Sequence, residues 1–266
     1  MATSKNKDIP YDVYIVFTAN HRPKKRGALM ADPSFAVLQK VRNGKRTFGI
    51  TPRIPGGFIS PADMIKIANV AEKYKGQLKI TSGQRITILG IRPEDVDLAW
   101  QDLDMDPGVK SPYSVKNVEI CPAAFCKRAK QNSMKLGLRL EKKYYGRPAP
   151  NRTKIGVTGC LNACTSANSK DIVILADPEG YIVRVGGSAG FHPRLPDEIA
   201  RGLSEEETER MVDAVFDYYC EAAELGDKLG PFVDRIGLDV FIQGVMEKYN
   251  NMITIPNNEK DEEEEI

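Results

Sequence analysis

Apolar and polar residues alternate in two short segments near residue 80, with a helical pattern on either side. Gln77–Thr81 and Arg85–Leu89 alternate as strands do, and Ser60-Pro61 marks the start of a helix before them. A second helix is predicted over Arg92–Leu103. The predicted apolar face of the first helix comprises Met64, Ile67, Ala68 and Ala71. Helix–strand–strand–helix is typical of half of a ferredoxin-like α+β unit.

The second half of the chain alternates apolar strands with longer amphipathic stretches. Strands are predicted at Val115–Ile120 and Lys154–Thr158, and a hairpin joins Asp171–Leu175 to Tyr181–Val185. Helices are predicted at Lys127–Tyr145, with a basic exposed side, at residues 204–225 after the capping-box pattern Ser204-Glu-Glu-Glu207, and at Val240–Tyr249. This order indicates an α/β domain followed by C-terminal helices.

Residues 1–51 show less regular alternation of apolar and polar residues. This segment holds one strand-like run, Val13–Thr18, and a turn signal at Asn43-Gly44, and we treat it as an extension. The expected organisation is therefore an extension (1–51), a ferredoxin-like half-domain (52–112), a metal-binding domain (113–200), C-terminal helices (201–256) and an acidic disordered tail (257–266).

Composition and charge narrow the class of protein. The 266 residues are 41% hydrophobic and 28% charged, as in globular proteins, and no run of about 18 apolar residues predicts a membrane span. The polar N-terminus lacks a signal-peptide core, so we expect a cytoplasmic protein with reduced thiols.

The net charge of +2 conceals an uneven distribution. Residues 257–266 carry six acids and one lysine, which leaves +7 on the rest of the chain. A basic remainder suggests an anionic partner, either nucleic acid or a polycarboxylate cofactor. Because no groove-binding helix or base-stacking motif is recognisable, we do not expect a nucleic-acid partner.

Four of the five cysteines form two pairs, in CPAAFC and GCLNAC. Each pair begins where a predicted strand ends, and each is expected to lead into a helix, whose N-terminus favours thiolates. Soft sulfur ligands suit iron–sulfur clusters, zinc or copper(I). Zinc ligand pairs usually lie on small knuckles, so two pairs at strand ends favour an iron–sulfur site, with structural zinc or no metal as alternatives. Cys220 has no partner and is predicted to be a core thiol.

The segment NRTKIGVTGCLNAC resembles the cluster motif of sirohaem-dependent sulfite and nitrite reductases. VKNVEIC, KITSGQRITILGI and Val185-Gly-Gly-Ser188 add to a resemblance that covers about Arg53–Ser188. It implies that a 4Fe–4S cluster is held by Cys121, Cys126, Cys160 and Cys164. In this family the last cysteine also ligates the sirohaem iron, which makes Cys164 the bridge. The first pair is spaced C-x4-C, where the family usually has C-x5-C.

The resemblance also implies roles for basic and polar residues. Arg152 and Lys154 match the family's paired basic residues, and residues two apart on a strand face the same side, so both could bind one anion. The alternative is that they are ordinary exposed strand charges. Arg85 is a further candidate, although many members have arginine where this chain has Gly83. The expected cofactor-binding residues are Arg53, Asn117, Lys127, Arg128, Lys130, Arg139, Gly159 and Asn162.

The resemblance therefore implies a reductase that converts sulfite to sulfide with six electrons. The alternatives are reduction of nitrite to ammonia and a non-catalytic electron-transfer subunit of a larger reductase. Larger members of the family contain two homologous halves, and this chain has one. We expect a second copy or a related subunit to complete it, and a ferredoxin-like or other low-potential protein to supply electrons. His192 is expected in a surface loop.

Overall fold

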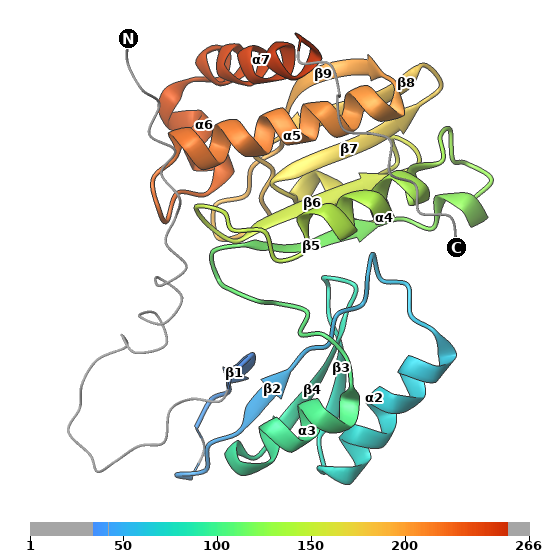
Figure 1. Cartoon of the computed structure of the whole chain (residues 1–266), viewed down its shortest axis with the longest axis vertical. Helices are drawn as coiled ribbons and strands as arrows, with labels where there is room; N and C mark the ends of the chain where they lie inside the picture. The colour runs from blue at the N-terminus through green and yellow to red at the C-terminus, as the bar shows by residue number, and fades with distance from the viewer. Residues whose placement is uncertain (1–33, 42, 255–266) are drawn as a thin grey trace.

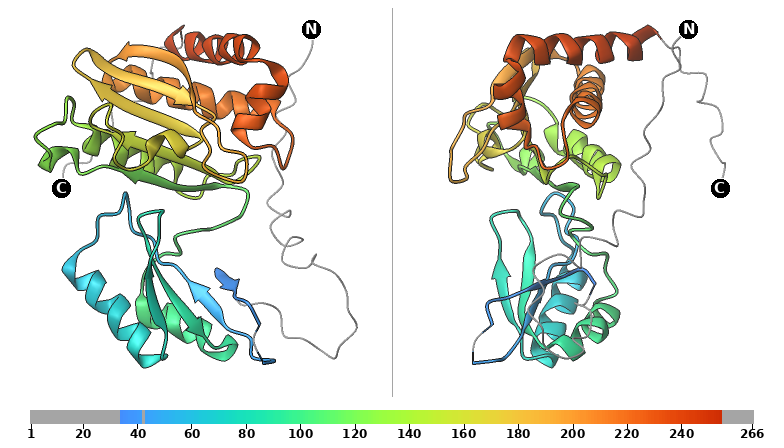
Figure 2. Two further views of the ribbon diagram at one scale, coloured as in Figure 1. Left: turned by 180° about the vertical axis from the view of Figure 1, so that it is seen from behind. Right: turned by 90° about the vertical axis from the view of Figure 1, so that its left-hand side faces the viewer.

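The computed structural model describes residues 34–41 and 43–254, which form two sheets with helices packed against each (Figure 1). The smaller, N-terminal unit lies against one edge of the larger, C-terminal unit in both views of Figure 2. The predicted strand Val13–Thr18 and the acidic tail lie outside the described residues. The α+β class predicted from the hydrophobic pattern is confirmed.

The first sheet is antiparallel and has the strand order β1-β2-β4-β3. Its strands are β1 (Ala36–Leu38), β2 (Phe48–Ile50), β3 (Gln77–Ile80) and β4 (Ile86–Ile91). Helices α2 (Pro61–Lys73) and α3 (Val96–Leu103) cover one face, and a short 3₁₀ turn, Pro93–Asp95, precedes α3. The expected separate extension up to residue 51 is wrong for the described residues, because β2 pairs directly with β4.

Helix α2 begins as predicted but buries a different face. The Ser60 hydroxyl accepts a hydrogen bond from the Asp63 backbone N–H at 3.0 Å, which caps the helix. Ile67, Val70 and Ala71 are buried against the sheet, whereas Met64 is 42% exposed and Ala68 is also exposed. The apolar face was therefore predicted correctly only in part, because alanine and methionine do not by themselves mark the buried side.

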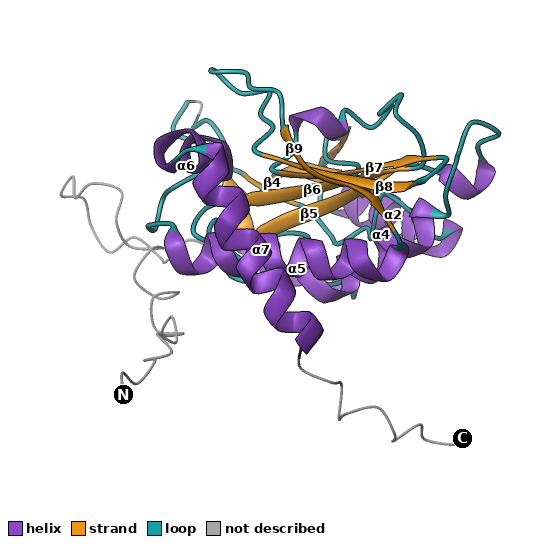
Figure 3. Cartoon of the chain, turned by 90° about the horizontal axis from the view of Figure 1, so that it is seen from above, coloured by secondary structure: helices purple, strands orange, loops and turns teal. Residues whose placement is uncertain are grey.

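The second sheet has the strand order β5-β6-β7-β8-β9, with β5, β6 and β7 parallel and the last two pairings antiparallel. Its strands are β5 (Val115–Ile120), β6 (Thr153–Thr158), β7 (Ile172–Asp177), β8 (Gly180–Val185) and β9 (Asp197–Leu203). Its helices are α4 (Ser133–Tyr144), α5 (Glu205–Ala222), α6 (Leu229–Ile236) and α7 (Leu238–Thr254). Seen from above, α4, α5 and α7 lie on one side of the strands (Figure 3).

The two faces of this sheet differ in polarity. Val118, Ile120, Ile155 and Val157 join the core beneath the helices. Because side chains alternate along a strand, the residues between them point to the opposite face. That face carries Asn117 and Glu119 on β5 and Lys154 on β6, and we call it the polar face.

Several helix and strand boundaries in this unit differ from those predicted. The helix predicted over Lys127–Tyr145 begins only at Ser133, after a stretch of turns. Strand β9 and helix α6 were not predicted, and β9 crosses the expected boundary at residue 200. The capping box at Ser204 is confirmed, with reciprocal bonds between Ser204 and Glu207.

Candidate functional site

The two cysteine loops are neighbours because they follow adjacent parallel strands. Cys121 comes directly after β5, and Cys160 comes two residues after β6. The Cys121 backbone N–H donates to the Val157 carbonyl at 3.0 Å, and the Gly159 N–H donates to the Cys121 Sγ at 3.0 Å. The carboxyl ends of the two strands therefore bring both pairs of thiols to the same edge of the sheet.

Gly159 lets the loops approach this closely. A Cβ at Gly159 would lie 2.6 Å from the Ala123 Cβ, so any side chain there would separate the loops. The Gly159 carbonyl also accepts a bond from the Lys130 N–H at 2.7 Å. The backbones of the two loops therefore meet at Gly159 with no side chain between them.

Neither cysteine pair leads into an α-helix, so that expectation was wrong. A 3₁₀ turn, Ala123–Phe125, follows Cys121, and the second loop reaches another 3₁₀ turn at Ala167–Ser169. Within the second loop, Ala163 and Ser166 have φ angles of 47° and 55°. Polar groups of the loops themselves reach the sulfur atoms, because the Asn162 side chain donates to the Cys164 Sγ at 2.9 Å.

The outer thiols of each pair face solvent. Cys126 and Cys164 are exposed, and the neighbouring Phe125 is 81% exposed. Over residues 34–41 and 43–254, no three cysteine, histidine, aspartate or glutamate side chains converge as a ready metal site. The donor set nevertheless fits an iron–sulfur cluster, because four thiols lie on two adjacent loops that also offer backbone N–H groups.

The fifth cysteine lies elsewhere. Cys220, on α5, is half-buried, packs beside the main core, and lies 3.8 Å from the Pro148 carbonyl oxygen. Burial raises the pKa of this thiol to about 12, so it stays protonated at neutral pH. It has the character predicted for a core thiol.

Cations gather at the start of β5 and β6. Burial lowers the pKa of Lys154, and the positive charges of Lys170 and Arg152 lower it further, against the effects of Glu119 and Asp171. Burial also lowers the pKa of Lys116, together with the charges of Arg85, Lys154 and Arg152. Among the described residues, Arg152, Lys154 and Lys116 form no ion pair with an acid. Cations held this close without a direct ion-pair partner are typical of an anion-binding site.

Lys116 was missed in the sequence. It precedes Asn117 in VKNVEI, and Asn117 is the partner of Lys154 across the parallel ladder. The register shifts between Val115 and Asn117, so simple alternation does not tell which side Lys116 faces. A basic residue beside Asn117 was the signal that could have identified it.

A buried ion pair lies on the same face. The Lys170 Nζ is 2.7 Å from the Glu119 Oε2, and the two side chains are 6% and 1% exposed. Asn117 donates to the other Glu119 oxygen at 2.9 Å. Lys170 passes directly over Gly156, where a Cβ would lie 2.9 Å from the Lys170 Cγ. The pair therefore fills the polar face between the cations and the cysteine loops.

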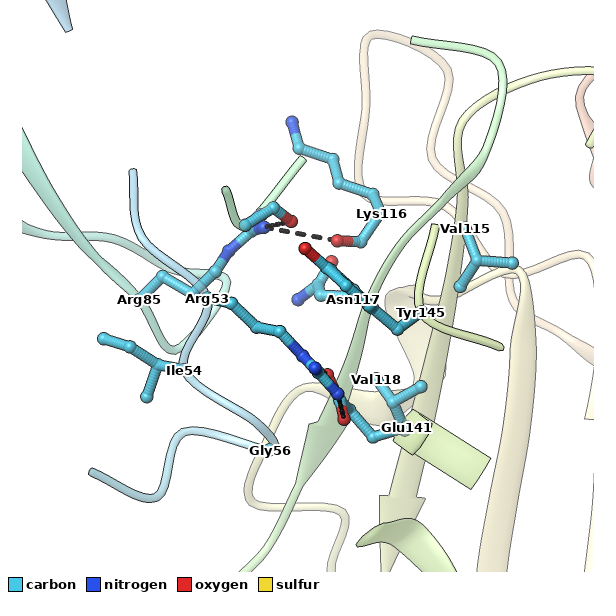
Figure 4. A pocket seen from close by; sticks show the side chains of 11 residues that line it. Arg53, Ile54, Gly56, Arg85, Val115, Lys116, Asn117, Val118, Glu141 and Tyr145 are labelled. Atoms are coloured by element: carbon cyan, nitrogen blue, oxygen red, sulfur yellow. Dashed lines mark hydrogen bonds and ion pairs between the residues drawn. The ribbon is translucent and has the colours of Figure 1, made fainter. Parts of the chain in front are cut away.

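Arg85 is buried between the two units. It is 7% exposed, and its Nη1 donates to the backbone carbonyls of Gly108 at 2.5 Å and Lys116 at 3.2 Å (Figure 4). Burial lowers the pKa of its guanidinium. The structure thus places Arg85 behind the backbone of Lys116, where it bonds the chain itself.

Arg53 also joins the two units. Its guanidinium forms a two-point ion pair with Glu141 on α4, at 2.9 and 2.6 Å, and stacks 3.9 Å from the centre of the Tyr145 ring. Arg53, Glu141 and Tyr145 line a small pocket of about 20 Å³, together with residues that include Arg85 and Lys116 (Figure 4). That volume holds about one water molecule, so this pocket is not a sirohaem cavity.

The remaining expected cofactor residues are divided between two places. Lys127, Arg128 and Lys130 are exposed on the loop after Cys126. Arg139 lies on α4, beneath the opposite face of the sheet, and pairs with Glu205 and Glu209. Arg139 therefore cannot share a ligand with Lys154. His192 is exposed in the loop before β9, as predicted.

The fold and the paired cysteine loops agree with the comparisons to known protein families. Residues 113–253 match the nitrite and sulphite reductase 4Fe-4S domain, and residues 39–105 match the nitrite/sulfite reductase ferredoxin-like half domain. The chain belongs to the sirohaem-dependent sulfite and nitrite reductase family, which is a family of oxidoreductases. Membership implies a 4Fe–4S cluster and sirohaem as cofactors.

The individual relatives include both sulfite reductases and nitrite reductases. The chain is 31% identical over 217 residues to the assimilatory-type sulfite reductase of Nitratidesulfovibrio vulgaris, which covers 81% of this chain and 98% of the relative. It is 34% identical over 202 residues to the nitrite reductase [NAD(P)H] of Bacillus subtilis, which covers 75% of this chain but only 25% of that protein.

Solved structures with a similar fold come from the same family. A dissimilatory sulfite reductase I superposes with a TM-score of 0.66 at 12% identity, covering 83% of this chain and 74% of that one. The Mycobacterium tuberculosis NirA protein gives 0.65 at 18% identity, covering 77% and 40%. In the described ranges, no helix has both the length and the apolar character needed to cross a membrane.

Proposed function

We propose that this protein reduces sulfite to sulfide with six electrons, using a cluster held by Cys121, Cys126, Cys160 and Cys164. The observation that carries the proposal is the arrangement of the polar face. Two cysteine loops meet at one end of β5 and β6, and cations without a direct ion-pair partner gather at the other end of the same strands. Cys164 is proposed as the bridge to the sirohaem iron.

The cations suit the binding and protonation of a small oxyanion. Arg152, Lys154 and Lys116 would bind its oxygen atoms through charge-assisted hydrogen bonds. Partial burial makes the Lys154 ammonium a better proton donor than an exposed lysine, which helps oxygen to leave as water. When bound, the sirohaem and the cluster supply the iron that takes the substrate and the electrons that reduce it. Arg85 would act by holding the backbone of Lys116.

The relatives favour sulfite as substrate without excluding nitrite. The sulfite reductase of Nitratidesulfovibrio vulgaris is matched over 98% of its own length. The nitrite reductase of Bacillus subtilis is matched over only a quarter of its length. We further propose a cytoplasmic protein that receives electrons from a low-potential redox protein and pairs with a second copy or a related reductase subunit.

Turnover by the purified chain tests the proposal. Reduced methyl viologen is the electron donor, and sulfide and ammonia are measured with sulfite and nitrite as separate substrates. Faster sulfide formation supports the proposal, and ammonia alone reassigns the substrate to nitrite. A chain that carries the cluster but forms neither product would be an electron-transfer subunit instead.

Replacing Lys154 with methionine should lower kcat/KM for sulfite by about 10- to 100-fold, the effect of losing a charged hydrogen bond to the substrate. Lys154→Arg should recover part of the loss because it restores the charge. Lys79→Met is the matched control, since Lys79 is exposed on β3. Steady-state kinetics checks the prediction, and a wild-type value for Lys154→Met would show that Lys154 is an ordinary strand charge.

A further inference from the structure

Strand β5 is the edge of the larger sheet that faces the smaller unit (Figures 1 and 2). The N–H and C=O groups on the outer side of an edge strand have no strand to pair with. In this protein, an isolated bridge between Gly56 and Glu119 and two side chains from the turn between β3 and β4 take that place. They matter because Lys116 lies near the start of β5 and Cys121 directly follows its last residue, Ile120.

The Gln84 side chain pairs with one residue of β5 at two points. Its Nε2 donates to the Ile120 carbonyl at 3.0 Å, and its Oε1 accepts from the Ile120 N–H at 2.9 Å. The amide thus reproduces the pairing that a neighbouring strand would give. Ile120 directly precedes Cys121, whose own N–H is bound on the opposite side to Val157.

The backbone around Gln84 is shaped for this contact. Gln84 has a φ of 57°, in the left-handed region that non-glycine residues seldom adopt. A Cβ at Gly57 would lie 2.9 Å from the Gln84 Cβ, and a Cβ at Gly56 would lie 2.4 Å from the Ile120 Cδ1. Both glycines of the Pro-Gly-Gly turn therefore leave the space in which Gln84 and Ile120 meet.

The residues on either side of Gln84 hold the rest of the strand. The Gly83 carbonyl accepts from the Asn117 side chain at 3.2 Å, and Arg85 donates to the Lys116 carbonyl at 3.2 Å. We call Gly83, Gln84 and Arg85 the strand clamp. One turn therefore fixes both the cation end of β5 and the end that carries Cys121.

We propose that Gln84 is a positioning residue that fixes Cys121 relative to the cations of the polar face by pinning Ile120. The inference rests on the proposed role of Cys121 as a cluster ligand. A neutral amide suits this task because it satisfies a donor and an acceptor at once without adding charge beside the cluster. Methionine fills a similar volume and makes neither bond, so it removes the positioning while keeping the packing.

The test compares cysteine reactivity in the full, iron-loaded chain. Wild-type protein and Gln84→Met are treated with an iron chelator and iodoacetamide together, and mass spectrometry follows alkylation of each cysteine. We expect Cys121 to react about tenfold faster in Gln84→Met, since two hydrogen bonds that hold its neighbour are lost. Cys126 and Cys220 should keep their rates, and the electron paramagnetic resonance spectrum of the reduced cluster should change. Gln77→Met, on the exposed strand β3, is the matched control and should behave as wild type.

A second variant keeps the test decisive if Gln84→Met does not fold. Gln84→Asn keeps a neutral amide but is one methylene shorter, so it cannot hold Ile120 at both points and should give an intermediate increase at Cys121. Wild-type reactivity of Cys121 in the folded variants, or an equal increase at every cysteine, would overturn the proposal. The wild type is also alkylated without the chelator, and if iron fails to protect Cys121 there, the ligand assignment itself is wrong and the proposal falls with it.

Discussion

Replacing Cys164 with serine is expected to lower sulfite reduction by about a thousandfold or more, because a hydroxyl is a poor ligand for iron and Cys164 is proposed to join cluster and sirohaem. Cys164 is exposed on its loop, and its Sγ accepts a hydrogen bond from the Asn162 side chain. The substitution should therefore leave the free energy of unfolding of the chain itself nearly unchanged. Iron content and sirohaem absorbance should fall together with activity.

Cys220→Ser is the matched control for this experiment. It makes the same exchange of sulfur for oxygen at a half-buried position on α5, away from the cysteine loops. Iron content should remain at the wild-type level in this variant. Full cluster and full activity in Cys164→Ser would contradict the proposed ligand set, whereas equal iron loss in both variants would point to a general effect on folding.

Lys170→Met is expected to lower the free energy of unfolding by about 3–5 kcal/mol, because it leaves the Glu119 carboxylate buried without its counter-charge. Glu119 is 1% exposed, so water cannot replace the lost ammonium group. Removing Lys170 also relieves its repulsion of Lys154, but Lys154 is only half-buried and that gain is smaller. Urea denaturation of the wild type and the variant, compared at equal iron content, measures the difference.

The double variant Glu119→Gln with Lys170→Met separates the charge effect from the packing effect. Without either charge the buried penalty disappears, so the double variant should be clearly more stable than Lys170→Met alone. A single variant that is as stable as the wild type would show that the pair is not buried in solution.

The local elements of this protein were largely predictable, and their long-range partners were not. β7 and β8 stand out in the sequence because they are nearly continuous apolar runs, and β5 and β6 because apolar and polar residues alternate along them. β1 and β2 are three residues each, too short to show alternation, and only their pairing with β4 places them in the sheet. β9, with the sequence DEIARGL, lies at the other edge and is mostly polar.

The candidate site was also predicted only in part, because a sequence pattern shows local features and not the partners that come from distant parts of the chain. The cysteine motifs and the predicted strand ends indicated that the cysteine pairs and the cations lie on two adjacent strands. The structure shows this arrangement on β5 and β6. The ion pairs of Arg53 and Arg139 could not be predicted, because their carboxylate partners lie 66 to 88 residues away in the sequence. Likewise, the pairing of Gln84 with Ile120 spans 36 residues and has no local signature.

The absorption spectrum of the anaerobically purified full-length protein, with its iron content, tests the central claim most directly. A sirohaem beside a 4Fe–4S cluster predicts coloured protein with haem bands that shift when sulfite is added, and about four irons per chain beyond the haem iron. Colourless protein that contains one zinc per chain would contradict the claim.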